Sequence, residues 1–153
     1  MIKVNDFKGS PIITEFAGVD LWRLSNPVYV EVLTNEGKLC YTMLAGFPTN
    51  MRSGSHLVDW LIPKFTGNNK YNLALLCHDF AYTQSKFQYN MLSRKLADEL
   101  LRQMAILSGE LGTFRAAIMH KALRVGGKWA YESENKGEYV GAEELMRFEW
   151  NSR

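Results

Sequence analysis

The hydrophobic pattern of the chain changes its period once, near Pro48, and this change limits the possible folds. Before it, residues 26–45 are rich in β-branched and aromatic side chains and are interrupted by NEGK, which is typical of a hairpin of two strands. After it, apolar residues recur at helical spacing in three segments, 70–83, 91–108 and 113–126. Strands therefore precede helices without β-α-β alternation. We expect an α+β fold, a strand-rich N-terminal part packed on three to four α-helices.

The whole chain, 1–153, is expected to form one domain. About 1–48 is strand-rich, about 49–127 is helical, and about 128–153 is a tail that ends in the amphipathic stretch AEELMRFEW. Two shorter strand candidates, SPIIT (10–14) and VDLWRLS (19–25), precede the hairpin, and SGSHLVDWLIP (53–63) predicts a short helix that stops at a proline.

Composition excludes several classes of protein. The net charge is only +2, and lysines and arginines are mixed with acids along the chain, so no nucleic-acid partner is expected. No apolar run approaches the ~20 residues that cross a bilayer, and the N-terminus has no signal-peptide core, so we expect no membrane span and a cytoplasmic protein. Cys40 and Cys77 sit among apolar neighbours and are expected to be free buried thiols.

The segment LLCHDFAY, from Leu75 to Tyr82, places a histidine and an aspartate in tandem within an apolar helix. On a helical wheel, His78, Asp79 and Tyr82 fall opposite the core face. The pair therefore faces solvent, a cleft or a second packed layer, and Leu75 on the same arc favours partial cover. The core face comprises Leu73, Leu76, Cys77, Phe80 and Ala81.

The next predicted helix carries Arg94, Asp98 and Arg102 opposite its own apolar face. These residues could form a surface ladder of ion pairs, each worth ~0.3–0.5 kcal/mol. Alternatively, Asp98 or Arg94 reaches His78 from an antiparallel neighbour, where a carboxylate would fix the imidazole tautomer and make it a better base. The second arrangement requires that this helix be covered on two sides.

Other motifs are weaker or absent. The spacing of histidines and cysteines matches no zinc motif, and neither a phosphate-binding glycine loop nor Gly-x-Ser-x-Gly occurs. Ser53, in RSGS, could hold an anion at a helix start, although an ordinary helix cap is the simpler interpretation. His120 and Arg124 share a face of the helix over 113–126 and are expected to be exposed.

From about Thr49 to Trp129, just over half of the chain resembles the bacteriophage and prophage family named domain of unknown function 1353. The pattern of that family is a Thr-Asp-x-x-Ser-x-Pro-like segment, a short apolar helix ending in Pro, Ala-x-x-His-Asp-x-x-Tyr, Arg-x-x-x-Asp, and Val-Arg-x-Gly-Gly followed by Trp. This chain has the matching residues in the same order: Thr49, Ser53, Pro63, LLCHDFAY, RKLAD from Arg94, and LRVGGKW from Leu123.

The resemblance implies a phage origin, which places the protein in the host cytoplasm or in association with the virion. Asn50 stands where the family has an aspartate, and GS replaces its proline after Ser53, so any role of that aspartate is impaired here. A local similarity to secretory phospholipases is confined to His-Asp-x-x-Tyr and an aspartate on an antiparallel helix. In those enzymes the histidine activates water, the adjacent aspartate binds calcium, and the second aspartate orients the histidine. Their disulfide framework and glycine-rich calcium loop have no counterpart here.

Two hypotheses follow. In the first, the chain is a phage-encoded hydrolase: His78 is the general base, Asp79 is a metal ligand or an electrostatic partner for a divalent cation, Tyr82 and Asp98 orient, and Arg94 binds an anion. In the second, it is a non-catalytic virion component or a protein that binds another phage or host protein. The same residues, His78, Asp79, Arg94 and Asp98, then form a polar network that fixes how two helices pack.

Overall fold

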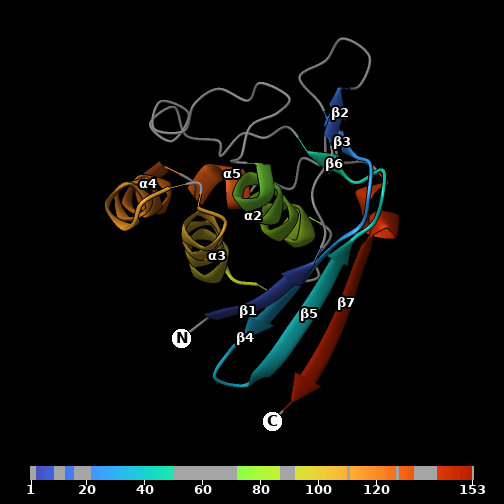
Figure 1. Ribbon diagram of the computed structural model, residues 1–153, viewed down its shortest axis with the longest axis horizontal. Coiled ribbons are helices and arrows are strands. Elements are labelled where there is room, and N and C mark those ends of the chain that lie inside the picture. The colour runs from blue at the N-terminus through green and yellow to red at the C-terminus, as the bar shows by residue number, and fades with distance from the viewer. Residues whose placement is uncertain are drawn as a thin grey trace.

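The computed structural model describes residues 3–8, 13–15, 22–49, 72–86, 92–109, 111–126, 128–132 and 141–152. In this part of the chain a twisted antiparallel sheet is covered on one face by helices (Figure 1). The α+β expectation is therefore confirmed. No helix among the described residues is both long and apolar enough to cross a membrane.

The main sheet has four strands in the order β1-β4-β5-β7, all antiparallel to their neighbours. Its central pair is the predicted hairpin, closed by a bond of 2.8 Å from the amide of Thr34 to the carbonyl oxygen of Gly37. The side chains on β4 alternate between fully buried valines and partly exposed residues, as expected for a sheet with one covered face. The strands are β1 Lys3–Lys8, β4 Val28–Leu33, β5 Gly37–Met43 and β7 Met146–Ser152.

A smaller antiparallel sheet lies at one end of the main sheet (Figure 1). It consists of β2 (Ile13–Glu15), β3 (Trp22–Leu24) and β6 (Pro48–Thr49), and it confirms that strands form in both short candidate segments. Strand β6 matters for the site because it carries Thr49, which is fully buried, to the side of the helical layer.

Four helices follow: α2 Asn72–Lys86, α3 Arg94–Leu107, α4 Thr113–Gly126 and α5 Lys128–Glu132. Local signals set the ends of α3. The hydroxyl of Ser93 accepts a bond from the amide of Leu96 at its start. Gly109, with φ of 72°, allows the chain to leave the helix, and the amide of Leu111 then bonds back to the carbonyl of Ala105. The helix predicted over 53–63 lies outside the described residues.

Three of the described strands were not predicted: β1, β6 and β7. β1 precedes the short candidates, and β7 occupies the tail that was expected only to be amphipathic. In β7 the side chains of Met146, Phe148 and Trp150 are paired in register with Met43, Tyr41 and Leu39, which belong to the core face of β5. The tail is therefore an edge strand of the main sheet. The alternation of its apolar and polar residues fits a strand with one covered face.

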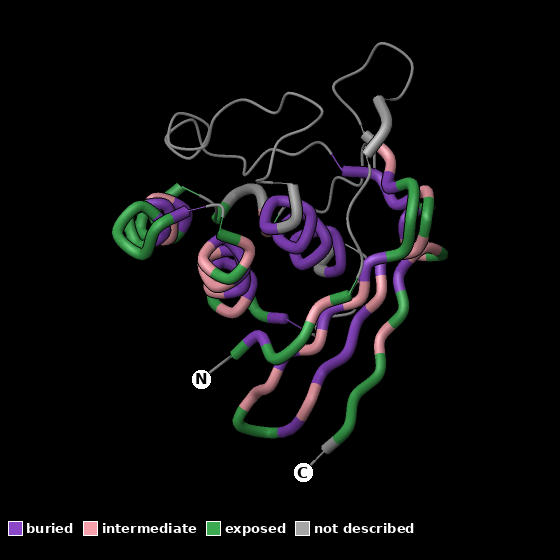
Figure 2. Tube along the Cα trace, viewed as in Figure 1, coloured by how far each residue is buried: buried purple, intermediate pink, exposed green. Residues whose placement is uncertain are grey.

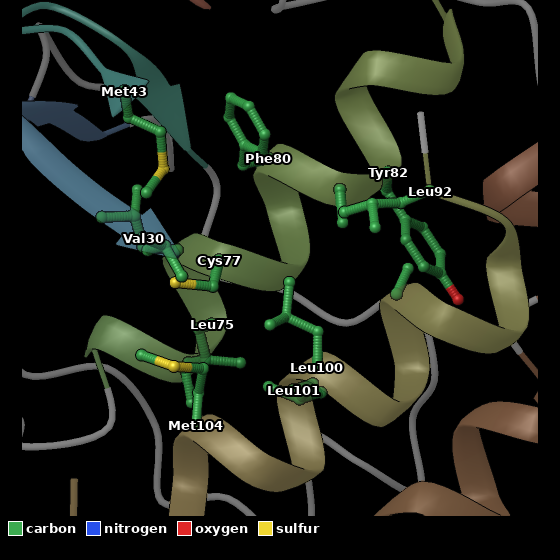
Figure 3. Packing of buried hydrophobic residues seen from close by; sticks show 14 of the residues in the cluster. Val30, Met43, Leu75, Cys77, Phe80, Tyr82, Leu92, Leu100, Leu101 and Met104 are labelled. Carbon is green, nitrogen blue, oxygen red and sulfur yellow. The ribbon is translucent and has the colours of Figure 1, made fainter. Parts of the chain in front are cut away.

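The core lies between the sheet and α2, where aromatic rings are in contact. The ring of Phe80 stacks on Tyr41 at a centroid distance of 4.4 Å, and it also contacts Phe47 and Phe148. Figure 3 shows Phe80 directed from α2 toward the strands, whereas Tyr82 is directed toward α3. Helix α2 thus contributes one side to the main core and the other to its contact with α3. Cys40 and Cys77 are buried thiols outside any disulfide, as predicted.

Candidate functional site

Helix α2 is buried on all sides, and this decides where its polar residues lie. Every residue from 74 to 84 is buried, as the continuous purple of α2 in Figure 2 shows. His78 is 1% exposed and Asp79 is 4% exposed, so the solvated face that the wheel allowed is wrong. The second side of α2 is instead covered by α3 and α5. The polar residues opposite the core face therefore point into a second packed layer.

The centre of this layer is the carboxylate of Asp98, on α3, which is fully buried. Its Oδ1 accepts a hydrogen bond of 2.7 Å from the hydroxyl of Tyr82, and its Oδ2 accepts one of 2.9 Å from Nη1 of Arg124. Both oxygens are thus fixed by donors from two other helices, α2 and α4. The surface ion-pair ladder is wrong for Asp98, because α3 is covered on two sides.

His78 lies beside this carboxylate. Its Nε2 is 3.7 Å from Oδ1 of Asp98, and its ring is 4.0 Å from the ring of Tyr82, tilted by 40°. A distance of 3.7 Å is too long for a hydrogen bond but short enough for an electrostatic interaction. Neither ring nitrogen has a hydrogen-bond partner in the described part of the chain. The imidazole is therefore positioned by packing and charge, and both of its nitrogens are buried.

Protonation at the site follows from burial and from these contacts. Burial raises the pKa of Asp98, but the interactions with His78, Tyr82 and Arg124 outweigh it, so the pKa lies below its usual range. Burial, reinforced by Asp98, raises the pKa of Tyr82 well above its usual range. Asp98 is therefore an anion and Tyr82 a neutral hydrogen-bond donor across the physiological range.

Arg94 also reaches this layer, although its donors are largely directed elsewhere. Its Nη2 donates to the carbonyl oxygens of Leu123 and Arg124, at 2.8 and 2.7 Å, in the last turn of α4. Its Nε is 3.8 Å from Oδ2 of Asp98. These contacts support a role in joining α3 to α4 rather than in binding an anion. Arg102, the third member of the predicted ladder, pairs with Glu99 instead.

His78 and Asp79, which are adjacent in the sequence, contact different parts of the fold. The carboxylate of Asp79 accepts a short hydrogen bond from the hydroxyl of Thr49, on β6, whereas His78 faces α3. Adjacent residues on a helix are 100° apart, so His78 and Asp79 meet different neighbours. No group of three or more His, Cys, Asp or Glu residues that could hold a metal ion exists among the described residues. The proposed role of Asp79 as a metal ligand therefore stays a prediction.

Sequence reasoning missed three participants. Arg124 is exposed, as expected, but its guanidinium also donates a hydrogen bond to Asp98, a contact that was not predicted. Thr49 was quoted in the family pattern without a role. Tyr131, on α5, packs edge-on against Tyr82 at 5.1 Å and donates to the carbonyl of Leu92 at 2.6 Å. No spacing rule links these residues to α2, since each comes from a separate element. Ser53 and Asn50 lie outside the described residues.

The fold and site define an α+β protein with a buried histidine–carboxylate centre shared by three helices. Searches against family models, curated proteins and solved structures found no match. The resemblance to the phage family therefore rests on the quoted residues. Several of those residues are in contact across the fold: Thr49 with Asp79, and Arg124 with Asp98.

Proposed function

We propose that the chain is a hydrolase in which His78 is the general base and Asp98 orients and stabilises it. The observation that carries the proposal is the buried carboxylate of Asp98, held ionised by Tyr82 and Arg124, with the imidazole 3.7 Å away and its nitrogens unbonded in the described part of the chain. A histidine next to an oriented carboxylate is the arrangement of a general base.

In the proposed reaction Nε2 of His78 closes on Asp98, since catalytic hydrogen bonds are often long in the free enzyme and shorten with substrate. Nδ1 then takes a proton from water, and the hydroxide formed attacks the substrate. The negative charge of Asp98 stabilises the imidazolium that results, and the proton passes on to the leaving group. Tyr82 and Arg124 keep Asp98 in place. The phage-family resemblance supplies the proposed setting, a host cell infected by a phage.

A second candidate is a non-catalytic virion component or a protein that binds a phage or host partner. The observation that favours it is the set of bonds that Arg94 and Arg124 make between α3 and α4 around a fully buried Asp98. In this case the polar layer serves to fix helix packing, and His78 fills space beside Tyr82.

The two proposals differ in what His78→Gln does. The purified chain is assayed against a panel of chromogenic carboxylic esters and phosphodiesters, and its urea unfolding is measured in parallel. If His78 is a general base, His78→Gln should lower the activity about 100-fold or more and change the free energy of unfolding only slightly. His120→Gln is the matched control, because His120 is partly exposed beside Glu99 on the surface of α3 and α4 and should leave both properties unchanged.

The hydrolase proposal fails if the activity of the wild-type protein survives His78→Gln. It also fails if no member of the panel is cleaved while the substitution lowers the free energy of unfolding by several kcal/mol. That second result is the one expected of a structural network.

A further inference from the structure

Helix α4 carries large apolar side chains on the face turned away from the core. Phe114 is 76% exposed, Val125 is 84% exposed and Ile118 is 38% exposed. Their spacing of four and seven residues places them within one narrow stripe of the helix. The buried residues of α4, which are Ala116, Met119 and Leu123, occupy the opposite side. Helix α4 is therefore apolar on two opposite faces, of which only one has a partner in the core.

This stripe lies at the outer limit of the helical layer. In Figure 1, α4 is on the far side of α3 from α2, and in Figure 2 its outer turns are green. Isolated exposed apolar residues are normal on a protein surface, but three large ones aligned along one helix mark an interaction surface.

The charge around the stripe is of one sign. Helix α4 itself contains Arg115, Lys121 and Arg124 and no aspartate or glutamate, and the nearest acids along the chain are Glu110 and Glu132. Arg124 is engaged with Asp98, whereas Arg115 and Lys121 are exposed. By helical angle these two basic residues lie on either side of the apolar stripe. The surface therefore combines exposed aromatic and aliphatic groups with flanking cations.

We propose that this face of α4 binds an anionic lipid surface, with Phe114, Ile118 and Val125 inserted at the headgroup boundary and Arg115 and Lys121 at the phosphates. Apolar residues flanked by basic ones are the composition of helices that lie in a membrane interface. A second copy of the chain fits less well, because a symmetric contact through this stripe would bring like charges together with no acid to pair them. The proposal is independent of the reaction assigned to His78.

The test is co-sedimentation of the full chain with vesicles of phosphatidylcholine alone or mixed with phosphatidylglycerol. Wild-type protein is expected to bind the mixed vesicles and not the neutral ones. Phe114→Ser/Val125→Ser should weaken binding about tenfold or more, and Arg115→Glu/Lys121→Glu should do so about tenfold. The matched controls are Trp150→Ser, which removes an exposed aromatic from β7, and Lys3→Glu/Lys95→Glu, which reverses two exposed charges elsewhere. Both controls should bind as wild type.

Any one of five results would overturn the proposal. The first would be that wild-type protein does not sediment with the mixed vesicles, and the second that it sediments equally with the neutral ones. The third would be that the α4 variants bind the mixed vesicles no more weakly than their control variants. A further contrary result would be a wild-type dimer in sedimentation velocity that Phe114→Ser/Val125→Ser converts to a monomer, because this would assign the stripe to a second copy. The last contrary result would be a much larger loss of melting temperature for the same double variant than for Trp150→Ser, because this would assign the stripe to the folded core.

Discussion

At the scale of single residues, Asp98 has the most demanding environment in the described part of the chain. A buried carboxylate is stable only when its charge is compensated, and here Tyr82, Arg124 and Arg94 compensate it. The interactions that keep Asp98 ionised thus also tie together three helices. Whether the site is catalytic or structural, the negative charge at this position is what organises it.

Asp98→Asn is expected to lower the free energy of unfolding by about 1.5–3 kcal/mol near neutral pH, because it removes a fully buried anion that accepts hydrogen bonds from Tyr82 and Arg124. The pKa of Asp98 is lowered in the folded protein, so its stabilising effect is fully present above the unfolded value of about 3.9 and is lost as pH falls through the folded value. Urea unfolding of both proteins from neutral to acid pH should show their difference shrinking below about pH 4.

Glu99→Gln is the matched control for this experiment. Glu99 is the next residue of α3, and its pKa is also lowered, chiefly by a hydrogen bond with Arg102, but that pair is partly exposed. Its loss should cost about 0.5 kcal/mol or less. Equal losses for the two substitutions would show that burial of the charge at Asp98 contributes nothing beyond a surface pair.

At the scale of elements, the contact between α3 and α4 depends on Arg94. Its guanidinium bonds to the carbonyls of Leu123 and Arg124, which are in the last turn of α4 and lack partners within the helix. A positive charge at a helix C-terminus also interacts favourably with the helix dipole. Arg94 therefore acts as a cap for α4 supplied by a neighbouring helix.

Arg94→Met keeps most of the aliphatic side chain and removes these bonds. It is expected to destabilise the protein by about 1.5–3 kcal/mol and to speed amide hydrogen exchange selectively in the last turns of α4, relative to α2. Arg102→Met is the control, since Arg102 contacts Glu99 within its own helix and its removal should cost about 0.5 kcal/mol or less. Unchanged exchange in α4 of the Arg94 variant would contradict the capping role.

Elements with a clear period could be predicted from the sequence, and elements whose partners are distant could not. The hairpin over 26–45 and the helices α2, α3 and α4 were expected close to their observed limits, because runs of β-branched residues and the helical spacing of apolar residues are local signals. The strand β7 was missed, although Met146, Phe148 and Trp150 alternate with polar residues. Its strand conformation depends on pairing with β5, more than a hundred residues earlier in the chain.

The site shows the same division. His78, Tyr82 and Asp98 could be proposed as neighbours because each lies opposite the apolar face of its own helix, and the structure brings them together. The donor Arg124 and the hydroxyl of Thr49 could not, because a helical wheel describes one element and carries no information about which neighbour covers it.

At the scale of the whole molecule, Phe80 connects the two layers. It lies on α2 and contacts Tyr41 of β5, Phe148 of β7, and Phe47 between β5 and β6, so two strands of the main sheet are joined to the helices through one ring. Aromatic pairs in this geometry contribute about 0.5–1.5 kcal/mol beyond the area that they bury. The sheet and the helical layer should therefore unfold as one cooperative unit.

Phe80→Ala is accordingly expected to cost about 3–5 kcal/mol, because it removes a fully buried ring and leaves a cavity between the layers. Phe114→Ala is the matched control: it makes the same chemical change on the exposed face of α4 and should alter stability by no more than about 0.5 kcal/mol. In wild-type protein, urea transitions followed by far-UV circular dichroism and by tryptophan fluorescence should coincide. If they separate, or if Phe80→Ala abolishes only one of them, the helices and the sheet are stabilised independently and the ring does not couple them.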